Sequence, residues 1–397
     1  MSKTNYSEIR LKKGREAALL RGHPWVFSGA IASVRGKPAA GDFVVCKDYR
    51  DKKLALGFYN PHTDIAFRLL TAKCDDSING NFWNERAAAA FQLRKRIINA
   101  QTDAYRLINA EGDGFPGLIA DVYSSTLVVS VSTAGMEKQK SLILDALIKT
   151  LRPKNIYEKS EGRSRQIEGL EEIKDFLYGE EKTETVLIKE NGKVFEIDFV
   201  GGQKTGFFLD QRVNREKLGA LSGAANILNC FSYSGAFSVY CAAGGATRVV
   251  SVDVSKSACA QAIKNLQLNG FSSDNYPVVE ADVFDYLRQL QEDFDLIILD
   301  PPAFAKNKGD VSRAARGYKD INLQAIRRLV RGGILASFSC SNHIDEELFY
   351  KIVLGAARDA GAQVQVLTRL QAGPDHPVLL AHPEGSYLKG LLIRKMN

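Results

Sequence analysis

The sequence predicts an α/β protein with a C-terminal doubly wound, Rossmann-like domain, preceded by a small N-terminal β-barrel and a central α+β domain. Three patterns predict this: strands alternate with helices from Asn226 onward, short strands separated by Gly, Pro and Asp fill the first part, and a mixed pattern lies between. We place the domains at 1–72, 73–184 and 185–397. A chain of 397 residues, 45% of them hydrophobic, is long enough for several cores.

The N-terminal part carries the positive charge of the chain. Residues 1–72 hold 13 Lys and Arg against 6 Asp and Glu, which equals the whole formal charge of +7. A localised basic excess suits a polyanion such as nucleic acid, although it is also typical of an ordinary solvated surface. After a basic, helix-like start, short strands are predicted over 25–27, 42–45, 54–59 and 65–70.

The central part shows a mixed pattern whose purpose the sequence does not indicate. It opens with a helix rich in alanine and arginine and ends in a polar stretch that reaches about Glu184. The predicted helices cover 84–99 and 137–151, and the predicted strands cover 117–122, 126–132 and 155–159.

Five mostly apolar strands are predicted in the C-terminal part, over 226–231, 248–253, 276–282, 294–300 and 333–340. Such strands are typical of a parallel sheet that is buried on both faces. Ligands of doubly wound sheets bind outside the carboxyl ends of the strands. The residues that end each strand are therefore the candidates for a site.

Membrane and metal functions are not indicated. No stretch approaches the roughly 18 uninterrupted apolar residues of a spanning helix, and the polar start over 1–14 lacks the apolar region of a signal peptide. We expect a cytoplasmic protein. The six cysteines show no C-x-x-C pair and no clustering with histidine, so we expect thiols and no metal site.

The ends of the first three strands predict a cofactor site. The turn after the first strand is not G-x-G-x-x-G, which argues against a nicotinamide dehydrogenase and leaves a nucleoside cofactor without phosphates. Asp253 can accept both hydroxyls of a ribose, although an aspartate here also suits a helix N-cap. Asp282 is expected at the adenine amino group, and Gly235 permits a tight turn. The predicted cofactor residues here are Phe231, Ser232, Ser234, Gly235, Asp253, Asp282 and Val283.

The fourth and fifth strands predict where the chemistry takes place. Asp300-Pro301-Pro302 forms an extended turn that can present the carboxylate and bare carbonyls to the edge of a base. This motif also serves amino-group methylation, so it does not name the target atom. A thiolate that adds to carbon 6 of cytosine makes carbon 5 nucleophilic, which predicts Cys340 as the nucleophile. The alternative is a buried structural thiol.

The motifs together resemble the RlmI-like family of large-subunit (23S) ribosomal RNA cytosine-C5 methyltransferases, from end to end of the chain. They are Gly22-His23-Pro24-Trp25-Val26-Phe27-Ser28-Gly29, Lys204-Thr205-Gly206-Phe207-Phe208-Leu209-Asp210-Gln211-Arg212, Asn229-Cys230-Phe231-Ser232-Tyr233-Ser234-Gly235, Asp300-Pro301-Pro302-Ala303-Phe304, Arg316-Gly317-Tyr318-Lys319-Asp320 and Phe338-Ser339-Cys340-Ser341. The resemblance implies an N-terminal PUA domain that binds RNA, a central domain similar to an RNA-recognition fold, and S-adenosyl-L-methionine as cofactor.

The resemblance also implies that Gln211 and Arg212 help to hold the cofactor, and that ribosomal RNA is the partner. Asp300 is expected both at the cofactor and at the N3 and amino edge of the cytosine. The sequence departs from some members at Ala303, where they carry lysine, which weakens any role for that side chain. It also lacks the second cysteine with which another family of RNA cytosine methyltransferases releases its product, so the base that removes the C5 proton is unassigned.

The expected function is methylation of a flipped-out cytosine in structured RNA, since a base inside a stem cannot reach a thiol at a sheet edge. Two rivals stay open. An enzyme that methylates a base nitrogen needs Asp-Pro-Pro but no thiol, and an RNA-binding ribosome assembly factor needs neither. The sequence does not give the oligomeric state, and a homodimer stays open as a partner.

Overall fold

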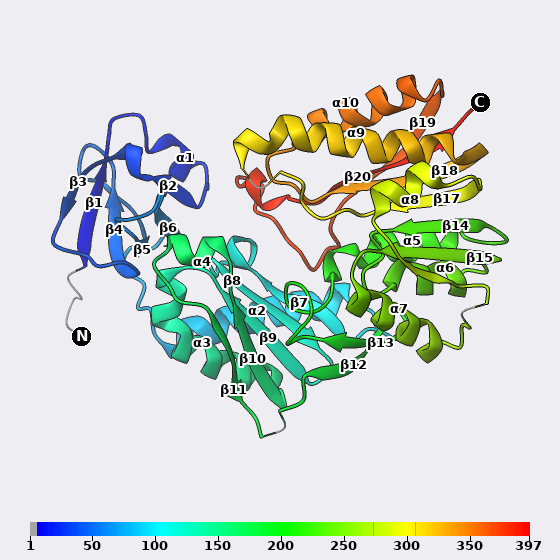
Figure 1. Ribbon diagram of the computed structural model, residues 1–397. Helices are drawn as coiled ribbons and strands as arrows, with labels where there is room; N and C mark the ends of the chain where they lie inside the picture. The colour runs from blue at the N-terminus through cyan, green and yellow to red at the C-terminus, as the bar shows by residue number, and fades with distance from the viewer. Residues whose placement is uncertain (1–5, 181, 273, 306) are drawn as a thin grey trace. The chain divides into compact units, whose positions relative to one another are not determined.

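The computed structural model describes residues 6–180, 182–272, 274–305 and 307–397. Its chain forms two compact units that interleave along the sequence (Figure 1). The first unit comprises Met1–Val186, Ile197–Phe207 and Pro374–Gly385, and the second comprises Leu187–Glu196, Phe208–Gly373 and Ser386–Asn397. Among the described residues, no helix combines the length and the apolar character needed to cross a membrane.

The N-terminal part of the first unit is a six-stranded sheet in the order β2-β6-β5-β4-β1-β3. Its elements are β1 (Ser7–Leu11), α1 (Ala17–Leu20), β2 (Trp25–Phe27), η1 (Ser28–Ala30), β3 (Ile31–Arg35), β4 (Asp42–Lys47), β5 (Lys53–Tyr59) and β6 (Ile65–Thr71). The prediction of a helix-like start is wrong over β1, because Ile9 and Leu11 alternate with polar residues and are fully buried, which is the period of a strand.

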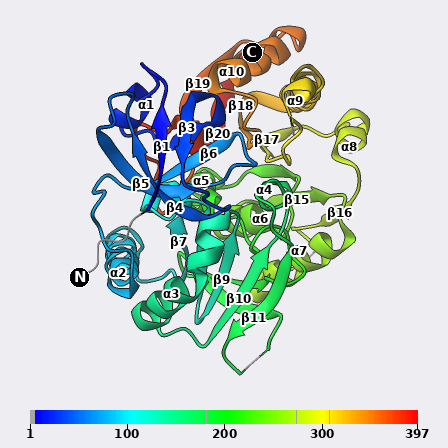
Figure 2. The same ribbon diagram turned by 90° about the vertical axis from the view of Figure 1, so that its left-hand side faces the viewer.

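A five-stranded sheet in the order β11-β10-β9-β8-β7 forms the centre of the first unit (Figure 2). Helices α2 and α3 pack against each other and share a core with the sheet that includes Trp83 and Leu147. The elements are α2 (Gly80–Ile97), β7 (Ala104–Asn109), η2 (Ala110–Asp113), β8 (Leu118–Tyr123), β9 (Thr126–Val131), α3 (Ala134–Leu151), β10 (Asn155–Ser160), α4 (Arg163–Ile167) and β11 (Ile173–Tyr178). Strands β7 and β11 were not predicted.

Buried residues link the N-terminal sheet to the central part of the same unit. Phe58 and Leu70, from β5 and β6, belong to the core around Trp83. The guanidinium of Arg68 pairs with Glu111 and Glu168, at 3.2 Å each, and these two carboxylates are buried. Removal of the N-terminal sheet would therefore leave two buried carboxylates without their cation. The predicted boundaries at 72 and 184 stay predictions.

The second unit is built on a seven-stranded sheet in the order β16-β15-β14-β17-β18-β20-β19. The first five are parallel, and β20 pairs antiparallel with β18 and β19. The strands are β14 (Asn226–Cys230), β15 (Arg248–Asp253), β16 (Val278–Glu280), β17 (Phe294–Leu299), β18 (Leu329–Ser339), β19 (Val364–Leu370) and β20 (Lys389–Lys395). A separate two-stranded sheet pairs β12 (Thr185–Glu190) with β13 (Lys193–Asp198).

Helices cover both faces of the seven-stranded sheet, so the predicted doubly wound fold is confirmed (Figure 1). Residues of α8, α9 and α10 share one core with Leu228 and Ile297, and residues of α5 and α6 share another with Ile227 and Ile298. The helices are η3 (Leu209–Gln211), α5 (Arg212–Ala220), α6 (Ala236–Ala243), α7 (Lys256–Leu268), α8 (Val283–Gln289), η4 (Lys308–Asp310), α9 (Val311–Arg327), α10 (Glu346–Asp359) and η5 (Pro383–Gly385), the last of which belongs to the first unit.

Two details of this sheet differ from the prediction. Strands β19 and β20 were not predicted, although β20 is the neighbour of the strand that ends before Cys340. The predicted third strand is shortened to Val278–Glu280, because Asp282 already serves as the N-cap of α8.

Candidate active site

The predicted site residues of the second unit follow neighbouring parallel strands. In the order β16-β15-β14-β17-β18, the strands end at or just before Asp282, Asp253, Phe231, Asp300 and Cys340, respectively. Because these strands are parallel, their carboxyl ends lie at one edge of the sheet.

The turn after β14 has an unusual backbone. Phe231 and Tyr233 adopt left-handed conformations with φ of 57° and 45°, which bulky side chains rarely adopt and which cluster at functional sites. Between them, Ser232 donates its N–H to Val252 O at 3.0 Å. The Oγ atom of Ser232 is buried and has no hydrogen-bond partner within the described part of the chain. Such an atom is suited to a polar ligand.

Gly235 ends this turn where α7 approaches most closely. Its φ is 74°, and a Cβ atom built on it would lie 2.8 Å from the Cβ of Ala262. The side chain of Asn265, also on α7, donates to the carbonyl oxygen of Ser234 at 2.9 Å. The glycine and the asparagine together hold the turn against α7, so its backbone is fixed before any ligand binds.

Asp253 is held in place by two backbone N–H groups. Tyr233 donates to Oδ2 at 2.8 Å, and Ser255 donates to Oδ1 at 2.9 Å. The alternative that Asp253 caps the next helix is wrong, because the N-cap of α7 is Ser255. Each carboxylate oxygen has further acceptor capacity, which two adjacent hydroxyls could use.

Asp282 and Val283 mark the start of α8. Asp282 is exposed and accepts from the N–H of Asp285 at 3.1 Å as the N-cap of this helix, while Val283 is buried. One carboxylate oxygen of Asp282 is therefore already used to cap α8. Its contact with an adenine stays a prediction.

Gln211 and Arg212 join η3 to α5, and both are buried. The Oε1 atom of Gln211 accepts from Asn214 Nδ2 at 2.6 Å. Just before them, the ring of Phe208 lies edge-on to that of Tyr233, with centroids 5.2 Å apart. This contact brings the segment that carries Gln211 and Arg212 beside the turn after β14.

The thiol of Cys340 lies at the Asp-Pro-Pro turn. Strands β17 and β18 are neighbours, as expected, with Leu299 opposite Ser337. The Sγ atom of Cys340 donates a weak hydrogen bond to the carbonyl oxygen of Pro301 at 3.8 Å. Cys340 is half-buried, whereas Cys241 is fully buried and its burial raises the pKa of that thiol to about 12. Cys340 is thus more accessible than a core cysteine.

A network around Ser341 was missed by the sequence reasoning. Its Oγ atom lies 3.0 Å from the hydroxyl of Tyr318 and accepts from the N–H of Ala305 at 3.3 Å. Its carbonyl oxygen accepts from Lys389 Nζ at 2.7 Å. The motif around Tyr318 could have indicated a role for that residue. Nothing in the sequence marks Lys389, which lies 48 residues after Ser341 and approaches it only through the pairing of β18 with β20.

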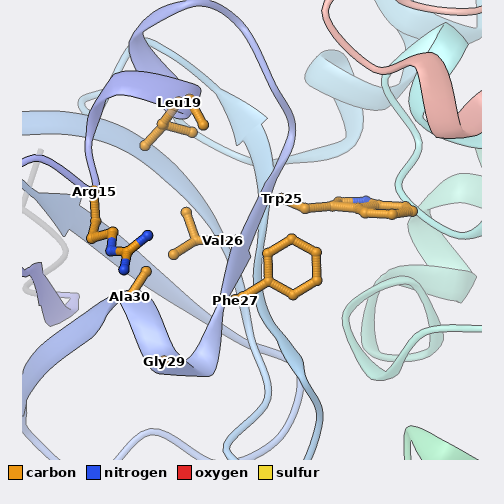
Figure 3. A pocket seen from close by; sticks show the side chains of 8 residues that line it. Arg15, Leu19, Trp25, Val26, Phe27, Gly29 and Ala30 are labelled. Atoms are coloured by element: carbon orange, nitrogen blue, oxygen red, sulfur yellow. The ribbon is translucent and has the colours of Figure 1, made fainter.

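A separate pocket of 330 Å³ lies on the N-terminal sheet of the first unit (Figure 3). Most of its lining residues are apolar, and Arg15 adds a basic group to the lining. Lys12, Lys13 and Arg21 lie close to the short helix α1 in the sequence. The ring of Phe27 is half exposed there. The residues that line it are Arg15, Ala18, Leu19, Trp25, Val26, Phe27, Gly29 and Ala30.

Comparisons with known proteins match nearly the whole chain. The family model of S-adenosylmethionine-dependent methyltransferases matches residues 106–394, and that of the PUA-like domain matches residues 9–72. The ribosomal RNA large subunit methyltransferase I of Alteromonas mediterranea is 42% identical to this chain, over 97% of this chain and 98% of its own length. That of Aeromonas hydrophila is 44% identical, over 98% of this chain and 99% of its own length.

Solved structures agree with this match. A Streptococcus mutans protein assigned as an S-adenosylmethionine-dependent methyltransferase aligns with a TM-score of 0.85 and 26% identity, over 98% of this chain and 99% of its own. A structure with the same scores is that of a methyltransferase complexed with S-adenosylhomocysteine. The chain therefore belongs to the S-adenosylmethionine-dependent methyltransferases, with an N-terminal PUA-like domain, and within them to the family of ribosomal RNA large subunit methyltransferase I.

Proposed function

We propose that this protein methylates carbon 5 of a cytosine in large-subunit (23S) ribosomal RNA and that Cys340 is its nucleophile. The RNA class is supported by the names of the relatives, which span the same length. The observation that carries the C5 assignment is the 3.8 Å contact between Cys340 Sγ and Pro301 O, which joins a thiol to the turn expected to hold the base. A base-nitrogen methyltransferase has no use for a thiol at this position.

The residues that end strands β14 to β16 fit the cofactor. S-adenosylmethionine supplies a methyl group on a positively charged sulfur. Asp253, already fixed by two N–H groups, would accept the ribose hydroxyls, and the buried Oγ atom of Ser232 would gain a polar partner. Ser234 and Gly235 would form the floor beside Phe231, and Gln211 and Arg212 would approach from η3 and α5.

In the proposed reaction, the thiolate of Cys340 forms a bond to carbon 6 of the cytosine. The electron pair of the C5–C6 double bond moves onto carbon 5, which takes the methyl group, and the electrons of the broken sulfur–methyl bond stay on the cofactor sulfur. A base then removes the proton from carbon 5. The electrons of that C–H bond restore the double bond, and Cys340 leaves as a thiolate.

Asp300 is assigned to the cytosine. Its carboxylate follows β17 directly, beside the turn that Cys340 contacts. It would accept a hydrogen bond from the amino group of the cytosine, and from N3 when that nitrogen is protonated. Two prolines after it remove two backbone donors, so the carbonyls of the turn face the base without competing N–H groups. A cytosine must leave its stack to reach this turn.

The N-terminal domain would bind the RNA outside the catalytic unit. Its half-exposed Phe27 offers a stacking surface, and the basic residues around α1 suit the phosphates. We also place the protein in the cytoplasm with its ribosomal substrate.

The position of the methyl group tests this proposal. The full-length protein would be incubated with radiolabelled S-adenosylmethionine and large-subunit RNA from cells that lack it, and the RNA would be digested to nucleosides. We expect the label in 5-methylcytidine. Label in a nitrogen-methylated base would establish the first rival, and RNA binding without any transfer would establish the assembly factor.

A further inference from the structure

We propose that Lys389 is a positioning residue for Cys340, which fixes the turn that carries the thiol and stabilises its thiolate form. The inference rests on the proposed function, because it assigns how the nucleophile is activated. It concerns a residue outside all the motifs of the sequence.

Lys389 anchors the turn that follows Cys340. It opens β20 directly opposite Ser339, one residue before the cysteine. Its Nζ atom donates to the carbonyl oxygens of Ser341 and Ile344, at 2.7 and 2.6 Å. The N–H of Ile344 donates to the same Ser341 oxygen at 3.1 Å, which closes the turn. One ammonium therefore holds both ends of the segment 341–344.

A second anchor restrains the same residue from the other side. The hydroxyl of Ser341 contacts Tyr318 on α9 and the N–H of Ala305 in the loop after the Asp-Pro-Pro motif. Ser341 is fully buried. The residue next to Cys340 is thus fixed by β20, by α9 and by the loop that contains Asp300, and this leaves the thiol little freedom to move away from the turn.

The groups around the thiol favour a nearby cation when the thiol ionises. Pro301 offers Cys340 a carbonyl oxygen, which accepts from a thiol and repels a thiolate. Lys389 on β20 and Tyr318 on α9 interact electrostatically with Cys340, and Asp345 and Glu346 at the start of α10 interact with Lys389. Asp300 precedes Pro301 directly, and His343 lies within the turn after Cys340. Lys389 supplies an ammonium group among these described residues, and it interacts electrostatically with Cys340.

The pKa of the Lys389 ammonium is lowered overall by its burial. Cys340, Asp345 and Glu346 act on this pKa in the opposite direction. Such an interaction is mutual, since a thiolate that favours the ammonium is favoured by it in turn. Two carbonyl acceptors also favour the charged lysine.

Lys389→Met tests this arrangement, with Lys395→Met as the matched control. Lys395 lies at the other end of β20 and donates to Leu329 O at 2.8 Å, so it makes the same kind of bond away from the site. The rate at which iodoacetamide alkylates Cys340 would be followed against pH in the full-length protein without RNA, by mass spectrometry of the Cys340 peptide. We expect alkylation at neutral pH to fall about tenfold in Lys389→Met, one pKa unit, and to stay unchanged in the control.

Methylation should follow the same pattern, with a lower kcat, an unchanged KM for S-adenosylmethionine and a pH–rate profile displaced to higher pH. Lys389→Arg should keep most of the wild-type alkylation rate, and Lys389→Gln, which keeps a donor without the charge, should not. An alkylation profile that is unchanged in Lys389→Gln would overturn the inference, even if activity is lost. If Lys389→Met does not fold, the comparison of Lys389→Arg with Lys389→Gln tests the inference in its place. An active Cys340→Ala enzyme would instead overturn the proposed function while leaving the alkylation result intact.

Discussion

Cys340 and Pro301 follow the carboxyl ends of two neighbouring strands of one sheet, and the Sγ atom of the first is 3.8 Å from the carbonyl oxygen of the second. The sequence separates them by 39 residues, and the parallel pairing of β17 with β18 brings them together. A thiol beside an Asp-Pro-Pro turn is the arrangement that the proposed C5 chemistry requires.

Cys340→Ala should abolish methyl transfer and leave the affinity for S-adenosylmethionine nearly unchanged. In the proposed mechanism the thiol acts on the base at the end of β18, whereas the proposed cofactor residues follow β14 to β16. Activity and calorimetric binding would be measured on the same preparation. Cys74→Ala is the matched control, because Cys74 is also half-buried but lies in the first unit. Residual activity in Cys340→Ala would argue for nitrogen methylation.

Asp253→Ala should weaken cofactor binding at least tenfold, because a charged acceptor for two hydroxyls contributes about 1.5 to 3 kcal/mol. The variant also loses the acceptor for the N–H groups of Tyr233 and Ser255. Asp253→Asn keeps one acceptor oxygen and should lose less. Calorimetry measures both, and wild-type affinity in Asp253→Ala would remove this residue from the site.

Gly235→Ala should destabilise the turn after β14 and reduce cofactor affinity. Its new Cβ would lie 2.8 Å from that of Ala262, and its φ of 74° is unfavourable for alanine. Gly270→Ala is the control, since Gly270 also has a positive φ but has open space around it. We expect Gly235→Ala to lower the free energy of unfolding by about 1 to 3 kcal/mol more than the control, from the overpacking alone. Equal losses in urea denaturation would contradict the close contact.

Phe27→Ala should reduce RNA affinity about fivefold to a hundredfold, since stacking of a base on an aromatic ring contributes about 1 to 3 kcal/mol. The ring is half exposed, so folding and cofactor binding should not change. Fluorescence anisotropy with labelled RNA at several salt concentrations would measure the affinity. Arg15→Ala should in addition reduce the salt dependence, as the loss of a phosphate contact requires. Normal RNA binding in both variants would move the RNA site elsewhere.

The seven-stranded sheet was largely predictable because its parallel strands are apolar runs that alternate with helices. The candidate site was predictable for the same reason, since ligands lie at the carboxyl ends of such strands. Strand β19 was missed although Val364, Val366, Leu367 and Leu370 are apolar, and most of its residues are exposed at the edge of the sheet. Strand β1 was misread because its charged residues obscured the alternation of Ile9 and Leu11.

Other features depend on tertiary structure and leave no local signal. Lys389 reaches Ser341 because β20 inserts antiparallel beside β18, a pairing that no short motif encodes. The conformations of Phe231 and Tyr233 are also imposed by the surroundings, because their side chains do not favour a positive φ. The role of Gly235 could be predicted from the sequence, because a tight turn with a positive φ favours glycine.

The most direct test of the account is a covalent adduct between Cys340 and RNA in which the target cytosine is replaced by 5-fluorocytosine. The thiolate can add to carbon 6 and the methyl group can reach carbon 5, but fluorine cannot leave as a cation, so the final elimination stalls. With S-adenosylmethionine present, we predict an adduct that survives denaturing electrophoresis and that mass spectrometry assigns to the Cys340 peptide. Cys340→Ala should form none. An active enzyme that forms no adduct on this RNA, or an adduct that persists in Cys340→Ala, would contradict the assignment of Cys340 as the nucleophile of a cytosine-C5 methyltransferase.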